Sequence, residues 1–276
     1  MAAGAPTLHW GAEALWERLE PLLPGLTVEV AASLDSTNTR LLELARRGDA
    51  APALLVAETQ TAGRGRLGRE WVAVPGASLT FSLALPYAPA DWSGLSLAIG
   101  LALAEALDPA AGEPRLWLKW PNDLWLRESA TGAGRKLGGI LIETVAVGER
   151  RQAVIGIGLN VRPEATAAVP GLVGRTACLA ELDASLTAPA ALARVAGPLV
   201  QALLRFQQQG FSPLQAAYAR RDGLAGQRVS TTLPQAPEGT AEGVDASGAL
   251  RVRAGGTLHA VGSGEVSVRV AESTAA

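Results

Sequence analysis

Hydrophobic and polar residues alternate along the first two thirds of the chain in patterns that predict a sheet flanked by helices. Residues 26–34, LTVEVAASL, follow the two-residue period of a strand, whereas residues 35–48, DSTNTRLLELARRG, space their apolar side chains as a helix does. The same criteria give strands at 53–59, 77–85, 136–148 and 151–161, and helices at 10–23, 93–107, 188–209 and 213–221. The expected fold class is therefore α+β.

A hairpin is predicted where RLWLKW (115–120) and DLWLRE (123–128) flank the turn PND. Both segments alternate strongly, so each is expected to form a half-buried strand. The turn would present Lys119 and Asp123 from the ends of two adjacent strands.

The pattern changes near residue 223. Short alternating segments there are separated by Gly, Pro and Ser-Gly turns about every ten residues, which is typical of a small all-β barrel. Two domains are predicted, one at 1–222 and one at 223–276.

Composition narrows the function classes. The 276 residues carry a net charge of −2, which argues against a general binder of nucleic acids or membrane surfaces. A single cysteine excludes an internal disulfide framework. No secretory signal is visible and the longest apolar stretch, 95–107, is too short to span a bilayer, so a cytoplasmic protein without membrane contact is expected.

Lysine and asparagine are scarce in this chain. Only two of the 24 basic residues are lysines, Lys119 and Lys136, and the asparagines are Asn38, Asn122 and Asn160. An Ala/Gly/Arg-rich bias would replace both residue types wherever they are dispensable. The two lysines and three asparagines that remain lie in or beside the motifs described next. The preference of asparagine for turns is an alternative explanation for some of these positions.

The segment TQTAGRGRLGREW, residues 59–71, combines three arginines with three glycines between two predicted strands. Gly63, Gly65 and Gly68 are expected to allow left-handed backbone, and the arginines offer planar cationic forks for phosphate or carboxylate oxygens. The segment is not a P-loop, because the lysine and hydroxyl of that motif are absent. A solvated loop or nonspecific RNA binding is the alternative, whereas the functional interpretation is a loop that orders around an anion.

Glycines also interrupt the two predicted strands that follow the hairpin. Gly138 and Gly139 come just after Lys136, and Gly156 and Gly158 interrupt IGIGLNV. Glycines weaken a packed sheet, so their presence on two successive strands favours the floor of a small-molecule slot.

Taken in order, the motifs DSTN, ETQTAGRGRLGREW, KWPNDLWL, RKLGGILIE and VIGIGLNV resemble the bacterial biotin protein ligases. The resemblance runs from Asp35 to Val161 and continues in GVDASGALRVR and SGEVSVRV near the C-terminus. It implies a catalytic domain like those of class II aminoacyl-tRNA synthetases, with a mixed, largely antiparallel sheet, followed by a small SH3-like β-barrel.

The resemblance also implies an activity. Members of the family use ATP and Mg²⁺ to convert biotin to biotinyl-5′-AMP, and then transfer biotin to a lysine of the biotin carboxyl carrier protein of acetyl-CoA carboxylase. The first step joins two anions, so cations must offset the charge that grows at phosphorus. Arginines on a closing loop would supply them and would also exclude water from the mixed anhydride.

Matching positions carry the family's site onto this chain. The resemblance implies biotin contacts at Ser36, Thr37, Asn38, Gln60, Arg64, Gly65, Arg66, Lys136 and Gly139. It implies ATP or adenylate contacts at Arg64, Arg66, Arg69, Trp71, Lys119, Asn122, Asp123, Lys136 and Asn160. Lys136, Arg64 and Asp123 are the expected catalytic residues, with Asp123 as a Mg²⁺ ligand or as the acceptor of a proton from the incoming lysine; no fixed metal site is expected.

Two departures from the family pattern bear on function. Only 34 residues precede Asp35, fewer than a winged helix-turn-helix needs, so DNA binding is not expected. The stretch RESATGAG, 127–134, predicts a longer exposed hairpin tip. The resemblance leaves homodimer formation through sheet edges open.

Two alternatives stay open from the sequence. A lipoate–protein ligase shares the architecture and chemistry, but the only histidines, His9 and His259, lie outside the motifs. A non-enzymatic biotin-binding regulator would need a DNA- or partner-binding module for which the N-terminal part is short.

Overall fold

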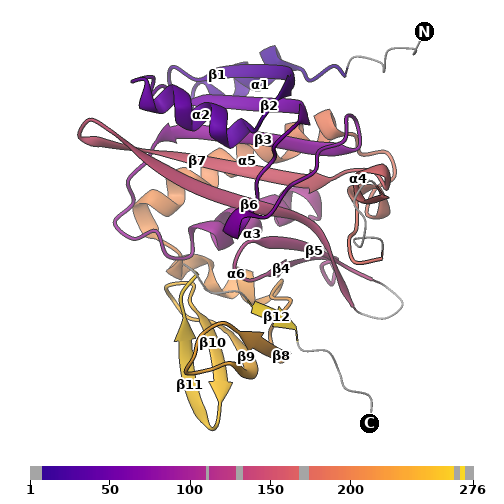
Figure 1. The fold of residues 1–276 in the computed structure, drawn as a ribbon, viewed down its shortest axis with the longest axis vertical. Coiled ribbons are helices and arrows are strands. Elements are labelled where there is room, and N and C mark those ends of the chain that lie inside the picture. Colours follow the sequence, from indigo (N-terminus) through magenta and orange to yellow (C-terminus); the bar gives the residue numbers. More distant parts are fainter. Residues whose placement is uncertain (1–7, 110–111, 129–132, 168–173, 264–267, 271–276) are drawn as a thin grey trace.

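The computed structural model describes residues 8–109, 112–128, 133–167, 174–263 and 268–270. A seven-stranded sheet with strand order β1-β2-β3-β7-β6-β5-β4 forms the larger part (Figure 1). Only β1 and β2 run parallel, and the other neighbours are antiparallel. The strands are β1 (Thr27–Leu34), β2 (Ala53–Gln60), β3 (Ser78–Pro86), β4 (Leu116–Lys119), β5 (Asp123–Arg127), β6 (Gly134–Val147) and β7 (Arg150–Asn160).

Helices cover the two faces of this sheet unequally. The helix α2 (Thr37–Arg46) lies on one face, while α3 (Leu95–Leu107) and α5 (Ala188–Gln209) pack together behind the other (Figure 1). The shorter helices are α1 (Ala12–Leu19), α4 (Glu164–Ala167) and α6 (Gln215–Ala219). None of the helices in the described ranges is long and apolar enough to cross a membrane.

The two faces differ in chemistry because side chains alternate along each strand. On β3, Leu79, Phe81 and Leu83 join the main hydrophobic core beneath α3 and α5. The intervening Thr80 and Ser82 face the α2 side, where the apolar cluster is much smaller. The α2 face thus has room for a polar site, and the opposite face holds most of the core.

The predicted elements of this region are confirmed with small shifts of their ends. The hairpin around residues 120–122 forms as β4 and β5, and the two glycine-containing strands form the antiparallel pair β6 and β7. The predicted helix 10–23 is shorter, since α1 gives way to turns before Pro21, whose ring disfavours helix for the residue that precedes it. Residues 129–132 of the hairpin tip predicted at 127–134 lie outside the described residues.

The C-terminal part forms a second, antiparallel sheet with strand order β11-β10-β9-β8-β12 (Figure 1). Its strands are β8 (Arg228–Thr231), β9 (Glu238–Val244), β10 (Leu250–Ala254), β11 (Thr257–Val261) and β12 (Val268–Val270). A small β domain after the helical segments is therefore confirmed, while barrel closure and the boundary at residue 222 stay predictions.

The connection between the two sheets follows the free edge of β4. Arg221 O accepts a hydrogen bond from Leu118 N, and Gly223 N donates to Leu118 O, so residues 221–223 extend the sheet. Arg221 is buried and its guanidinium forms an ion pair with the equally buried Asp108 at 3.0 Å. Breaking such a pair would leave an uncompensated buried charge, so this junction fixes β4 firmly.

Candidate functional site

A cavity of about 480 Å³ opens on the α2 face of the large sheet. Its size is that of a site for a cofactor-sized ligand. Its lining includes all fifteen residues that the sequence resemblance selected: Ser36, Thr37, Asn38, Gln60, Arg64, Gly65, Arg66, Arg69, Trp71, Lys119, Asn122, Asp123, Lys136, Gly139 and Asn160. The fold therefore brings all of them to one place, although their individual roles stay predictions.

The side chains from the start of α2, from β2 and from β3 at one end of the cavity are polar but uncharged, with the Arg64–Glu143 ion pair beside them. Ser36 caps α2, and Thr37 N donates to Gln60 Oε1 at 2.8 Å. Ser82 Oγ lies 2.6 Å from both Thr37 Oγ1 and Asn38 Oδ1. The three residues at the start of α2 are only 3–4 % exposed, so their polar atoms are held by neighbouring protein groups rather than by solvent. We call Ser36, Thr37, Asn38, Gln60 and Ser82 the neutral end.

Glycines on β7 make room for this arrangement. A Cβ at Gly156 would lie 2.3 Å from Asn38 Oδ1, and a Cβ at Gly158 would lie 2.4 Å from the Trp71 ring. Gly139, Gly156 and Gly158 line the cavity, as expected for the floor of a slot. The space above Gly156 and Gly158 is filled by Asn38 and Trp71, which themselves line the cavity.

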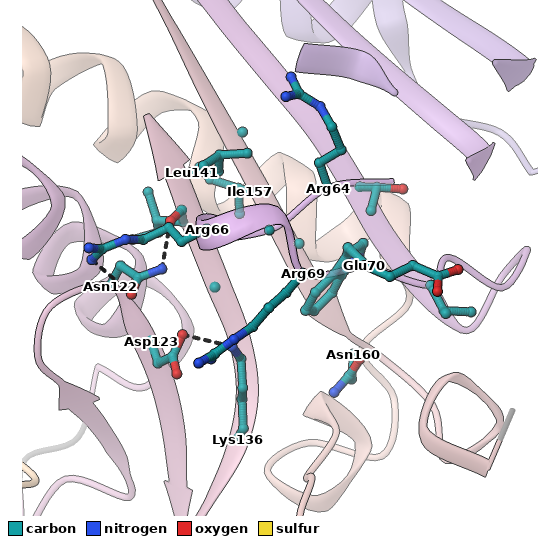
Figure 2. Close-up of a pocket in the computed structure, with 18 of the residues that line it drawn as sticks. Arg64, Arg66, Arg69, Glu70, Asn122, Asp123, Lys136, Leu141, Ile157 and Asn160 are labelled. Carbon is teal, nitrogen blue, oxygen red and sulfur yellow. Dashed lines mark hydrogen bonds and ion pairs between the residues drawn. The ribbon is translucent and has the colours of Figure 1, made fainter. Parts of the chain in front are cut away.

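The other end of the cavity carries most of the charge. Lys136 Nζ donates to Asp123 Oδ1 at 2.7 Å, and Arg66 Nη1 lies 3.4 Å from Asn122 Oδ1 (Figure 2). Arg69 extends toward the Lys136–Asp123 pair. Lys119 Nζ donates to Val268 O of β12 at 2.9 Å. We call Arg66, Arg69, Lys119, Asn122, Asp123 and Lys136 the charged end.

A β-bulge sets the position of Lys136. Asp123 pairs with Gly139 and Leu124 with Gly138, but the register shifts so that Trp125 pairs with Lys136. Residues 123 and 125 share one face of β5, so the shift places the lysine on the face that carries Asp123. Bulges of this kind change the direction of side chains beside functional sites. The sequence pattern did not indicate this bulge.

Electrostatics at the charged end favour an anionic ligand. Burial lowers the pKa of Lys119, and the neighbouring Lys136, Arg69 and Arg269 lower it further, while Asp123 opposes them. Burial also lowers the pKa of Arg66. Six cationic side chains and two carboxylates line the cavity as described, although the whole chain is slightly acidic. An anion bound here would offset the excess positive charge.

The backbone of the arginine–glycine loop corrects one prediction. Left-handed backbone occurs at Leu67 (φ 56°) and Gly68 (φ 70°), but not at Gly63 or Gly65. Gly63 is required for another reason, since a Cβ there would lie 2.2 Å from Trp71 O. Leu67 is a non-glycine residue in a conformation that costs roughly 1–2 kcal/mol, so its neighbours must hold the loop in this shape.

Arg64 lies apart from the other loop arginines. Its Nη2 atom forms an ion pair at 2.8 Å with Glu143, and Figure 2 shows its side chain directed away from the Lys136–Asp123 pair. Sequence reasoning missed Glu143, and also missed Ser82, Thr80 and Arg175. Polar residues at 80 and 82 between the buried hydrophobic residues of β3 were the available signal; for Arg175 the sequence offered none.

No group of three or more potential metal ligands occurs in the part of the chain that the structure describes. Glu70 and Asp123 are the carboxylates in the described lining. Asp123 is already paired with Lys136. These residues do not form a preassembled metal site. One carboxylate could still coordinate a metal ion that enters the cavity already bound to the phosphate oxygens of a ligand.

Comparison with protein families gives two matches. Residues 30–160 match the biotin/lipoate A/B protein ligase family, and residues 225–269 match the biotin protein ligase C-terminal domain. The first range contains the sequence motifs and most of the cavity lining, and the second covers most of the small β domain.

Individual relatives agree with these matches. The chain is 36 % identical over 266 residues to the bifunctional ligase/repressor BirA of Salmonella typhimurium, covering 93 % of this chain and 78 % of the relative. It is 35 % identical over 242 residues to the biotin–[acetyl-CoA-carboxylase] ligase of Paracoccus denitrificans. That match covers 85 % of this chain and 98 % of the relative. The structure of Aquifex aeolicus biotin protein ligase with biotin and ATP superimposes with a TM-score of 0.73 at 26 % identity, covering 88 % of this chain and 99 % of that one.

Proposed function

Because this chain belongs to the biotin protein ligase family, we propose that it is an ATP-dependent biotin–[acetyl-CoA-carboxylase] ligase. A carboxylate oxygen of biotin attacks the α-phosphorus of ATP, the bond to the β-phosphate breaks, and pyrophosphate leaves. A lysine amine of the carrier protein then attacks the acyl carbon of biotinyl-5′-AMP. AMP leaves, and the amine loses a proton.

The observation that carries this proposal is the division of a single cavity into a neutral and a charged end. Biotinyl-5′-AMP has a similar division, because an uncharged ureido ring is joined through an acyl chain to a phosphate. Fixed hydrogen-bonding groups suit the ring, and cations suit the phosphate. One ligand can therefore satisfy both ends at once.

At the neutral end, Ser36, Thr37, Asn38 and Gln60 are proposed to bind the ureido ring. Their side chains are already held by hydrogen bonds to one another or to neighbouring residues, so little conformational entropy is lost when a ligand binds. A site built to pair with a polar group rejects an analogue that lacks it, because buried donors and acceptors would then be left without partners. Lipoate has no ureido group.

At the charged end, Lys136, Arg66 and Arg69 are proposed to stabilise the charge that develops at the α-phosphate. Lys136 lies close to the proposed biotin position, since its Nζ is 3.5 Å from a Cβ built on Gly139, which is proposed to contact biotin. Cations fixed before the reaction stabilise developing charge without reorganising during the step. We therefore assign Lys136 as the main catalytic residue.

Lys119, Asn122, Trp71 and Asn160 complete the proposed nucleotide site. Asn122 is fixed by a hydrogen bond from its Nδ2 to Ile140 O at 2.9 Å, which leaves its Oδ1 toward Arg66. Mg²⁺ is proposed to enter with ATP, with Asp123 as a protein ligand or as a proton acceptor in the second step. The carrier protein of acetyl-CoA carboxylase is the proposed acceptor, and absence of DNA binding stays a prediction.

The test is exchange of labelled pyrophosphate into ATP, measured with biotin and lipoate side by side. Exchange with biotin and none with lipoate is expected. Exchange with lipoate alone would establish the lipoate ligase instead, and exchange with neither would reject adenylation. Transfer of labelled biotin to a purified carrier domain tests the second step.

A further inference from the structure

Glu143 on β6 connects the two parts of the site, and the sequence motifs assigned it no role. Its Oε2 accepts hydrogen bonds from Arg64 Nη2 at 2.8 Å and from Asn38 Nδ2 at 2.9 Å. Its Oε1 lies 3.1 Å from the same Arg64 nitrogen. One carboxylate thus holds the arginine–glycine loop and the neutral end together.

The contact to Arg64 acts on the whole loop. Arg64 forms a backbone bridge with Glu70, and Gly65 N donates to Arg69 O at 2.7 Å, so the loop closes on itself between these residues. Anchoring Arg64 to β6 therefore also places the segment that carries Arg66 and Arg69. The guanidinium of Arg64 is occupied by a carboxylate and lies away from Lys136, which favours an anchoring role over direct contact with phosphate.

The contact to Asn38 fixes the direction of its amide. The nitrogen donates to Glu143 and to Leu141 O, and the oxygen lies against Ser82 Oγ. An ionised carboxylate only accepts hydrogen bonds, so it admits the nitrogen of the amide and excludes its oxygen. Glu143, with the shorter of the two contacts, and Leu141 O together set which atom of Asn38 faces Ser82 and Gly156.

We propose that Glu143 is a positioning residue that couples the neutral end to the arginine–glycine loop, and so retains the adenylate between them. This inference rests on the proposed ligase function. Through Arg64 the carboxylate holds the loop over the cavity, and through Asn38 it orients the ring-binding amide. Loss of its charge should therefore speed escape of the adenylate more than it slows adenylate formation.

An ordinary exposed ion pair would not have this effect, since such pairs contribute only about 0–1 kcal/mol. The pair between Arg253 and Glu242 in the small β domain provides a control of similar exposure. Side-chain exposures are 43 % and 25 % for Arg64 and Glu143, and 46 % and 34 % for Arg253 and Glu242. Arg253 contacts both carboxylate oxygens through two guanidinium nitrogens, whereas Arg64 contacts both through Nη2 alone, so the control pair has at least as many hydrogen bonds but lies outside the cavity.

The experiment compares wild type with Glu143→Gln, Arg64→Gln, the double variant and Glu242→Gln. Release of preformed biotinyl-5′-AMP is followed by rapid filtration, and biotin KM and kcat are measured by pyrophosphate exchange. Glu143→Gln and Arg64→Gln should each release adenylate about tenfold faster, which corresponds to about 1.4 kcal/mol. In Glu143→Gln, biotin KM should rise several-fold and kcat should change by less than about twofold. Glu242→Gln should match wild type in every readout.

The double variant decides whether the two residues act as one unit. Coupled residues give a release rate close to that of either single variant, whereas independent residues give the product of both effects. An independent product, or release by Glu143→Gln at the wild-type rate, would overturn the inference. A melting temperature within a few degrees of wild type would show that these rates belong to folded enzyme. If wild type forms no adenylate with biotin, the proposed function fails before this comparison begins.

Discussion

The two ends of the cavity are built in opposite ways. The neutral end comes from the start of α2 and from β2 and β3, and its side chains are buried, apart from the half-buried Gln60, and held by hydrogen bonds. The charged end comes from a loop, a hairpin and β6, and Lys136 on β6 keeps about a third of its side chain exposed. Fixed dipoles are suited to selecting one ring, while cations on exposed segments are suited to phosphates that arrive, react and leave.

The largest effect should follow from removing the central cation of the charged end. Lys136→Ala is expected to lower kcat for pyrophosphate exchange by about 10³-fold, because a fixed charge next to the reacting phosphorus is lost. Biotin KM should change far less, since the neutral end is untouched.

Arg127→Ala is the control for this variant. Arg127 pairs with the exposed Glu113 at the far end of β5, and losing that pair should leave exchange at the wild-type rate. If Lys136→Ala retains a tenth or more of the wild-type rate, another group must act as the main cation and the assignment is wrong.

The next effect should come from disturbing the neutral end by a single methyl group. A Cβ in Gly156→Ala would meet Asn38 Oδ1 at 2.3 Å, so the amide must move away from Ser82. Displacing a buried hydrogen-bonded group costs about 1–3 kcal/mol, and biotin KM should rise roughly 10- to 100-fold. ATP KM should stay within about twofold.

Gly197→Ala in α5 is the matched control, since a Cβ at that buried glycine meets nothing within 4 Å. Its kinetics should equal those of wild type. A Gly156→Ala enzyme whose ATP KM rises as much as its biotin KM would show that the two ends are not separate.

Much of the fold and of the cavity lining could be predicted from the sequence. The features that could not be predicted depend on contacts between segments that are distant in the chain. Alternation along residues 77–85 predicted the strand, and every residue that the motifs selected lines the cavity, although the lining also contains residues that they did not select, such as Thr80 and Arg175. The bulge that re-aims Lys136 depends on pairing between β5 and β6, which no local pattern encodes. Glu143 is 79 residues from Arg64, so their contact arises only when the sheet forms.

The glycines of β7 also show what a single sequence can and cannot predict. Their positions correctly indicated close approach, but Gly156 and Gly158 make room for Asn38 and Trp71 rather than for a ligand alone. A single sequence shows where a side chain is missing. It does not show which neighbour uses the space.

A smaller effect should appear in the pH dependence of the charged end. Burial lowers the pKa of Lys119 below its usual value, so in the folded protein it loses its proton at a lower pH than in the unfolded chain. ATP KM should rise by a few-fold as pH increases through this lowered pKa. Folding stability should increase over the same range, because the unfolded chain then binds more protons.

Lys119→Arg sharpens this prediction, because a guanidinium stays charged throughout the range. The variant should show a flatter alkaline limb of ATP KM between pH 7 and pH 10, with biotin KM unaffected at neutral pH. Identical alkaline limbs in wild type and variant would assign the titration to another group.

The smallest effect should be a different response of the two ends to salt. Exposed charges are screened as the Debye length falls from about 10 Å at 0.1 M salt to about 3 Å at 1 M. ATP KM should therefore rise a few-fold over this range, and biotin KM should rise less. Equal salt dependence of both constants would contradict the assignment of an uncharged end.

The division of the cavity is tested most directly by a crystal structure of the protein with biotinyl-5′-AMP. The account predicts the ureido ring within hydrogen-bonding distance of Asn38 and Thr37, and the phosphate within reach of Lys136 and Arg66. A phosphate bound beside Asn38, or a ring bound beside Lys136, would contradict it.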